Sequence, residues 1–192
     1  MTDIPSHHLI YGTCVDFITG ESIVDTDDER YRQKLARMLV KEKGYKKSDL
    51  EVRLKIETLF AKQFVVSTID FVVRINDKRF MVIRYGPGSL VTRERPAVAA
   101  ARVLEPSYRI PLAVVTNGED AEIIDTRTGK VIRRGLQSLP DRAEASLLIN
   151  DLEFTPFNDI TKRERELRIL NAFDVEICCA GGPCPIPGAP EG

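Results

Sequence analysis

The chain has 192 residues, of which 43% are apolar and 30% charged, and its formal net charge at pH 7 is −1. This composition is typical of one folded domain, and it excludes a disordered chain and a globally basic nucleic-acid-binding protein. The longest apolar runs, such as residues 97–101, are too short to span a bilayer. The N-terminus, MTDIPSHHLIYG, lacks the basic start and apolar stretch of a signal peptide, so we expect a cytoplasmic protein without a membrane partner.

Charge is distributed unevenly along the chain. Residues 3–30 contain seven acidic side chains and one basic side chain, whereas residues 74–109 contain eight basic and three acidic ones. A local basic segment of this kind is able to contact phosphates, and a solvated surface is the equally simple interpretation.

The spacing of apolar residues predicts alternating helices and strands, because helices repeat every 3.6 residues and strands every two. The first helix begins among acidic residues and ends near Gly44, a residue suited to a C-cap. Two apolar, β-branched runs flank Asn76-Asp77 and predict a hairpin. An alanine-rich helix follows, and it tolerates Pro96 only in its first turn. The expected elements are a lead-in at 1–24 with turns at Gly12 and Gly20, a helix at 27–43, strands at 52–56, 64–75 and 79–85, a helix at 92–104, strands at 112–116, 121–125 and after Gly129, a short helix after Pro140 that ends with residues 147–152, and a helix at 162–172.

This order of elements predicts an α/β fold with a mixed central sheet, because helices must cover both faces of apolar strands. We expect a lead-in at 1–24, one domain at 25–176 and a tail rich in Cys, Pro and Gly at 177–192.

Three of the four cysteines fall in that tail, namely Cys178, Cys179 and Cys184. Their spacing matches no standard zinc site, and no histidine lies nearby in the sequence. A flexible tail that carries thiols is the simpler interpretation, and a metal or redox role stays open.

Four segments of the sequence carry a family resemblance: DERYRQKLARMLVKEKGY, STIDFVVRI, MVIRYGPGS and VVTNGEDAEIID. Over roughly residues 25–135 they resemble the N-terminal domain of type I restriction enzyme R subunits. That domain has the PD-(D/E)XK nuclease fold, so the resemblance implies a restriction-endonuclease-like sheet flanked by helices. Complete R subunits continue into a motor domain, and we therefore expect a stand-alone domain that does not translocate DNA.

In that family, a carboxylate at the end of one strand and an E-x-K sequence on the next hold Mg²⁺ and stabilise the developing charge. Glu and Lys two positions apart share one face of a strand. The resemblance places the first carboxylate at Asp70 and a helical glutamate at Glu29, with Asp28 as a near alternative. It places the E-x-K sequence at residues 83–85.

Two of the three E-x-K positions are altered in this chain. The glutamate is replaced by Ile83, which cannot bind a metal, and the lysine by Tyr85, which has no fixed positive charge. Arg84 is expected to face the opposite side of the strand. Only Asp70 and Glu29 then remain as ligands for Mg²⁺, and we expect the site to be degenerate.

Three functions stay open at this point. The leading one is a catalytically degenerate domain that binds DNA or a protein partner through the former active-site cleft. Arg84, Arg93 and Arg95 are then expected to contact phosphates. The second is a divergent Mg²⁺-dependent endonuclease, in which Lys78 or Arg84 supplies the charge and Glu94 the missing carboxylate. The third is an interaction, metal or redox module that uses the tail cysteines.

Each candidate residue also has a purely structural interpretation. Asp70 could pair with Arg74, and Glu29 could simply stabilise the start of its helix. Tyr85 could be a packed aromatic residue. The loop at 86–89 could offer backbone N–H groups to a phosphate, but it lacks the lysine of a P-loop and is more typical of a turn.

Overall fold

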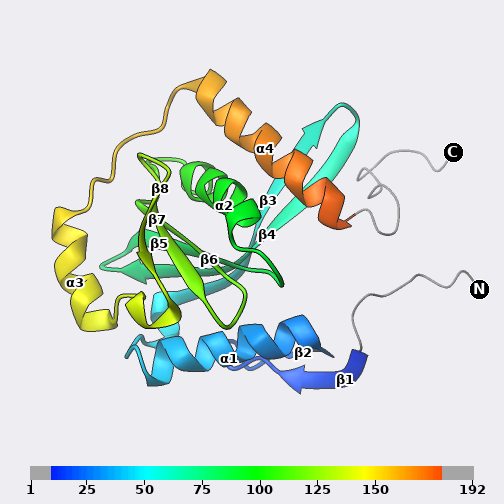
Figure 1. Cartoon of the computed structure of the whole chain (residues 1–192), viewed down its shortest axis with the longest axis vertical. Coiled ribbons are helices and arrows are strands. Elements are labelled where there is room, and N and C mark those ends of the chain that lie inside the picture. Colours follow the sequence, from blue (N-terminus) through cyan, green and yellow to red (C-terminus); the bar gives the residue numbers. More distant parts are fainter. Residues whose placement is uncertain (1–9, 179–192) are drawn as a thin grey trace, which may run out of the picture.

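A mixed six-stranded sheet with helices on both faces forms the centre of the protein (Figure 1). The structure is a computed structural model, and it describes residues 10–178. The strands lie in the order β3-β4-β5-β6-β7-β8; β5 and β6 are parallel, and the other neighbours are antiparallel. The expected α/β class with a mixed central sheet is therefore confirmed. The strands of this sheet are β3 (Leu50–Phe60), β4 (Gln63–Ile75), β5 (Lys78–Tyr85), β6 (Leu112–Thr116), β7 (Ala121–Asp125) and β8 (Lys130–Arg134).

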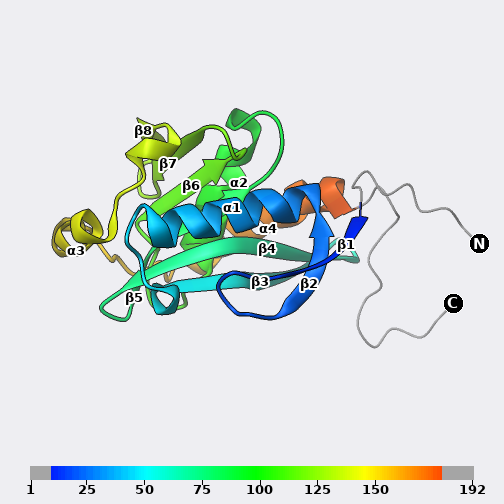
Figure 2. The ribbon, with the colours of Figure 1, turned by 90° about the horizontal axis from the view of Figure 1, so that it is seen from below.

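Two hydrophobic cores lie on the two faces of the sheet, one beneath α1 and the other beneath α2 and α4. Figure 1 shows the sheet between α1 and α4, and in Figure 2, seen from below, α1 lies in front of the sheet with α4 behind it. No helix among residues 10–178 is long and apolar enough to cross a membrane. The helices are α1 (Asp27–Lys41), α2 (Val91–Val103), α3 (Arg142–Asp151), α4 (Ile160–Cys178) and the 3₁₀ turns η1 (Lys47–Asp49) and η2 (Leu136–Ser138).

Most predicted elements are confirmed, with boundaries that differ by a few residues. Asn76 and Asp77 form the tight β4–β5 turn with φ angles of 49° and 62°, as a two-residue hairpin loop requires. The prediction that Pro96 lies in the first turn of its helix is wrong, because it is the sixth residue of α2. The missing N–H of proline removes one helical hydrogen bond there.

The two ends of the predicted domain differ more from expectation. The expected lead-in contains a hairpin of β1 (Ile10–Val15) and β2 (Ser22–Thr26), which runs directly into α1. At the other end, α4 continues through Cys178 and so includes the first residues of the expected tail. Cys179 and Cys184 lie outside the described residues, as does the side chain of Cys178.

In the long β3–β4 hairpin, the regular alternation of side chains between the two faces of the sheet is interrupted at Arg53 and Asp70. Val52 packs in the core beneath α1, whereas Leu54, two residues later, packs in the core beneath α2 and α4. Arg53 has a φ of 53°, a left-handed conformation that residues other than glycine seldom adopt. It falls opposite Asp70, because the neighbouring residue pairs are 52–71 and 54–69. This irregularity turns both side chains toward the start of α1, where they contact helix residues.

Candidate functional site

A cleft of about 280 Å³ opens where β5 ends, close to α1 and α4. Its charged lining consists of three carboxylates and three guanidinium groups, so the cleft is electrically balanced and is not a basic groove. These residues are Asp28, Asp70 and Asp174, and Arg32, Arg84 and Arg93. The other lining residues are Val66, Thr68, Tyr85, Gly86 and Pro87.

Asp70 is buried and both of its oxygens are engaged. Oδ1 accepts a hydrogen bond from Nε of Arg32 at 2.5 Å, and Oδ2 accepts one from the backbone N–H of Tyr85 at 2.7 Å. Asp70 lies within β4 and not at its end. At this position β4 and β5 have separated, because their pairing starts at residues 71 and 83. The carboxylate of Asp70 thus accepts the backbone N–H of Tyr85 in place of a backbone carbonyl of the neighbouring strand. Among the described residues, the ion-pair partner of Asp70 is Arg32 rather than Arg74.

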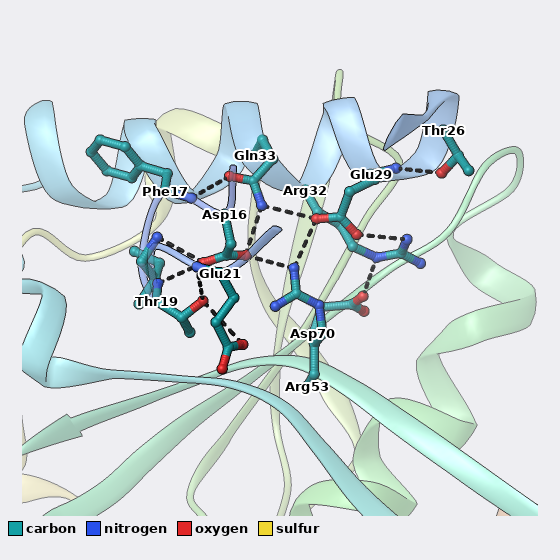
Figure 3. A network of polar contacts seen from close by, with 11 residues as sticks. Asp16, Phe17, Thr19, Glu21, Thr26, Glu29, Arg32, Gln33, Arg53 and Asp70 are labelled. Carbon is teal, nitrogen blue, oxygen red and sulfur yellow. Dashed lines mark hydrogen bonds and ion pairs between the residues drawn. The ribbon is translucent and has the colours of Figure 1, made fainter. Parts of the chain in front are cut away.

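Glu29 lies in the first turn of α1, where Thr26 caps the helix by accepting the N–H of Glu29 at 3.1 Å. Its side chain is buried, and Oε1 accepts hydrogen bonds from Gln33 at 2.9 Å and Arg53 at 3.0 Å. Gln33 and Arg53 also donate to Asp16, as Figure 3 shows. Glu29 is therefore more than an acid at a helix start, because it joins α1 to β3 and to the β1–β2 hairpin.

Arg32 lies between the two carboxylates that the resemblance assigns to the metal. Its Nη1 is 3.8 Å from Oε2 of Glu29, while its Nε bonds Asp70 (Figure 3). Burial acts to lower the pKa of Arg32, but the charge of Asp70 and their hydrogen bond outweigh burial and raise this pKa. The guanidinium thus stays charged and supplies a positive charge between the two acids.

Mg²⁺ does not fit these residues as they are arranged. Each oxygen of Asp70 accepts a hydrogen bond, and Glu29 faces the guanidinium groups of Arg32 and Arg53. A divalent cation between the acids would meet the like charge of Arg32, which costs free energy at short range. Residues 10–178 contain no group of three or more His, Cys, Asp or Glu side chains arranged to hold a metal ion.

The three residues at the E-x-K positions lie in three different environments. Ile83 is completely buried in the core beneath α1. Arg84 faces the side of α4, as strand alternation predicts, and its Nη2 donates to Oδ1 of Asp174 at 2.8 Å. Tyr85 lines the cleft and stacks on Tyr31 with ring centroids 5.7 Å apart. Burial, and then the nearby carboxylate of Asp28, raise the pKa of Tyr85, so its hydroxyl is a neutral hydrogen-bond donor.

Arg93, in the first turn of α2, lines the cleft and contacts the loop that follows β5. Its Nη2 donates to the carbonyl oxygen of Pro87 at 2.6 Å, and its guanidinium packs so closely on Gly86 that a Cβ there would overlap it. Burial and the charge of Arg84 lower the pKa of Arg93. Nε of Arg93 and Nη1 of Arg84 are buried and have no hydrogen-bond partner among the described residues. These two atoms are donors that remain for an anion.

The other sequence-predicted residues lie away from the cleft. Arg95 pairs with Glu166 at 2.5 Å and lines a different cavity. Lys78 begins β5, at the end remote from Tyr85, and its Nζ lies over the ring of Phe154. Glu94 lies beside Glu122 and, like Arg95, lines the other cavity. Neither Lys78 nor Glu94 therefore replaces a missing catalytic group in this cleft.

Sequence reasoning missed four residues that organise the site: Arg32, Arg53, Asp16 and Asp174. Arg32 carried a usable signal, because it lies three residues after Glu29 and so on the same helix face. The other three carried none, since their partners lie far away in the chain.

Comparison with known proteins gives one match. A family model described as type I restriction enzyme R protein N terminus matches residues 27–140, which is more than half of the chain and includes Glu29, Asp70 and residues 83–85. The comparisons with curated proteins and with solved structures gave no match. The family match confirms the resemblance drawn from the sequence. The chain therefore belongs to the family of type I restriction enzyme R protein N termini.

Proposed function

We propose that this chain is a non-catalytic, restriction-endonuclease-like domain that binds nucleic acid through its cleft. The observation that carries the proposal is the guanidinium of Arg32 between Glu29 and Asp70. Membership of a restriction enzyme family makes DNA the first partner to test.

The loss of catalysis is supported by three features of the cleft. A side-chain cation bridges the two acids, an apolar core residue stands at the glutamate position, and a neutral tyrosine stands at the lysine position. Metal-assisted phosphodiester hydrolysis needs a metal ion that polarises the phosphate and activates water. The arrangement around Arg32 disfavours that ion.

Binding is supported by two buried guanidinium donors of residues that line the cleft, Nη1 of Arg84 and Nε of Arg93, which have no hydrogen-bond partner among the described residues. Burial and then the charge of Arg84 lower the pKa of Arg93, and they outweigh the opposite effect of the Asp28 and Asp174 carboxylates. A phosphate placed there would satisfy both donors and offset the repulsion between the two cations. Phosphate contacts of this kind weaken as salt concentration rises.

We expect no cleavage of plasmid or single-stranded DNA by the wild-type chain in Mg²⁺ or Mn²⁺. The measurement is a gel assay over protein-to-DNA ratios up to stoichiometric amounts, with Asp70→Ala as the matched variant. Metal-dependent cleavage that disappears in Asp70→Ala would show that the chain is a divergent endonuclease and would overturn the non-catalytic proposal.

We expect Arg93→Ala to weaken oligonucleotide binding about tenfold, the loss of roughly one charge-assisted hydrogen bond. Fluorescence anisotropy of a labelled oligonucleotide, repeated at several salt concentrations, measures this change and its salt dependence. Arg30→Ala is the control, because Arg30 is exposed on α1 and pairs with Asp25. Equal affinity of the wild type and Arg93→Ala would contradict binding through the cleft, and absence of wild-type binding would refute nucleic acid as the ligand.

A further inference from the structure

A second, strongly basic hollow runs along α2, between this helix and the start of α4. It consists of a cavity of about 440 Å³ and a neighbouring one of about 330 Å³, which share Arg102 and Arg165. We call the two cavities together the basic trough. The trough and the cleft have no lining residue in common, although Glu94 and Arg95 of the trough adjoin Arg93 of the cleft along α2.

Cations outnumber acids in the trough, and they come from separate parts of the chain. Its basic residues are Arg95 and Arg102 of α2, Arg109 before β6, Arg127 after β7, and Lys162 and Arg165 of α4. Its acidic residues are Glu94, Asp159 and Glu166. Tertiary folding is therefore needed to gather this charge, and the basic segment seen in the sequence supplies only half of the cations.

The three acids do not neutralise all of these cations. Glu166 is buried and pairs with both Arg95 and Arg102. Asp159 caps α4 by accepting the N–H of Lys162 at 3.0 Å, and it also pairs with the Lys162 side chain.

Two arginines of the trough are left without a carboxylate partner among the described residues. Arg109 donates to the hydroxyl of Thr155 at 2.5 Å, and Arg165 is exposed and makes no side-chain hydrogen bond or ion pair within that part of the chain. Burial, and then the charge of Arg102, lower the pKa of Arg109, which reflects the crowding of cations. An anion would relieve this crowding.

We propose that the basic trough binds linked phosphate groups, at a site independent of the cleft. Guanidinium groups suit phosphate oxygens because they offer several N–H donors in a fixed plane. Two adjoining cavities accommodate more than one phosphate, and the larger has the volume of an ordinary small-ligand pocket. Phe157 and Pro156 line the same cavity and offer an apolar surface beside the cations. The phosphates belong either to a free nucleotide or to a nucleic-acid strand.

Inorganic triphosphate is the first probe, because it carries linked phosphates without a base. We expect millimolar triphosphate to raise the Tm of the whole chain by several degrees at low salt. Calorimetric titration should give at least about tenfold weaker binding for Arg109→Ala and for Arg165→Ala. Arg165→Ala guards against a folding defect, since that side chain is exposed and makes no hydrogen bond or ion pair with the described residues. The control is Arg168→Ala, which should bind as the wild type does, because the partner of Arg168 on the exposed face of α4 is Glu164.

Competition then identifies the source of the phosphates. Displacement of triphosphate by ATP but not by a short oligonucleotide indicates a nucleotide, and displacement by the oligonucleotide indicates a strand. The proposal is overturned if triphosphate does not bind the wild type, if both trough variants bind normally, or if Arg168→Ala loses as much affinity as they do. Because the cleft proposal depends on Arg93 and on oligonucleotide binding, the two proposals succeed or fail separately.

Discussion

Replacing Arg32 by methionine should destabilise the domain by about 2–4 kcal/mol, because it leaves two buried carboxylates without their shared cation. Asp70 would keep only the N–H of Tyr85, and Glu29 would keep Gln33 and Arg53. Methionine preserves the apolar stem of the side chain, so the loss reports mainly on charge. The free energy of unfolding from urea denaturation, measured in the presence of a chelator, tests this expectation.

The same variant should respond to divalent cations in a way that the wild type does not. Once the guanidinium is removed, Mg²⁺ or Mn²⁺ can take its place between the acids and stabilise the folded state by mass action. We therefore expect the Tm of Arg32→Met, but not of the wild type, to rise with millimolar Mg²⁺.

Arg30→Met provides the matched control on the same helix, because Arg30 is exposed and its ion pair with Asp25 lies at the surface. It should change stability little and should gain no metal response. Equal stability of Arg32→Met and the wild type, or stabilisation of both by Mg²⁺, would show that Arg32 does not replace a cation.

Asp16→Asn should give the second large effect, a loss of about 2–4 kcal/mol at neutral pH. Asp16 is buried and accepts hydrogen bonds from the backbone N–H groups of Ile18 and Thr19 and from Gln33 and Arg53. An asparagine amide would present its own N–H₂ group to two donors. The hairpin of β1 and β2 would then lose its main attachment to α1 and β3.

The contribution of Asp16 to stability should decrease as the pH falls. Burial acts to raise the pKa of Asp16, but the N–H of Thr19 and then Arg53 and Gln33 outweigh it and lower this pKa to about 2, from 3.8. A carboxyl whose pKa is lower in the folded state contributes its stability above pH 4 and loses it as the pH falls to 2. The difference amounts to about 2 kcal/mol.

Urea denaturation at a series of pH values between 2 and 7 measures this contribution. The wild type should lose about 2 kcal/mol more than Asp16→Asn between pH 4 and pH 2. Glu21→Gln is the control, because Glu21 is exposed in the same hairpin. Parallel pH profiles for the wild type and Asp16→Asn would show that Asp16 is not the group responsible.

The local features of this protein could be predicted from its sequence. Apolar spacing identified α1, the β4–β5 hairpin and α4, because the side-chain repeats of helices and strands depend on neighbouring residues alone. The replacement of Glu and Lys by Ile83 and Tyr85 was equally readable, since it follows from residue identity at matched positions. The position of Pro96 inside α2 could not be predicted in this way. The packing of the alanine-rich helix between the sheet and α4 outweighs the free-energy cost of one lost hydrogen bond.

The chemistry of the cleft was decided by tertiary structure. The interrupted side-chain alternation at Arg53 and Asp70 turns two charged side chains toward α1, and no local sequence pattern predicts it. Asp70 then takes Arg32, 38 positions away, as its ion-pair partner in preference to Arg74, four positions away. Arg84 pairs with Asp174 across 90 positions.

The sequence by itself determined the family, the sheet and the absence of the E-x-K residues. Only the fold decided where the remaining charges lie and which of them neutralise one another. The physical reason is that secondary structure follows from interactions within a few residues, whereas the partner of a buried charge is whichever opposite charge the packed chain brings within a few ångströms.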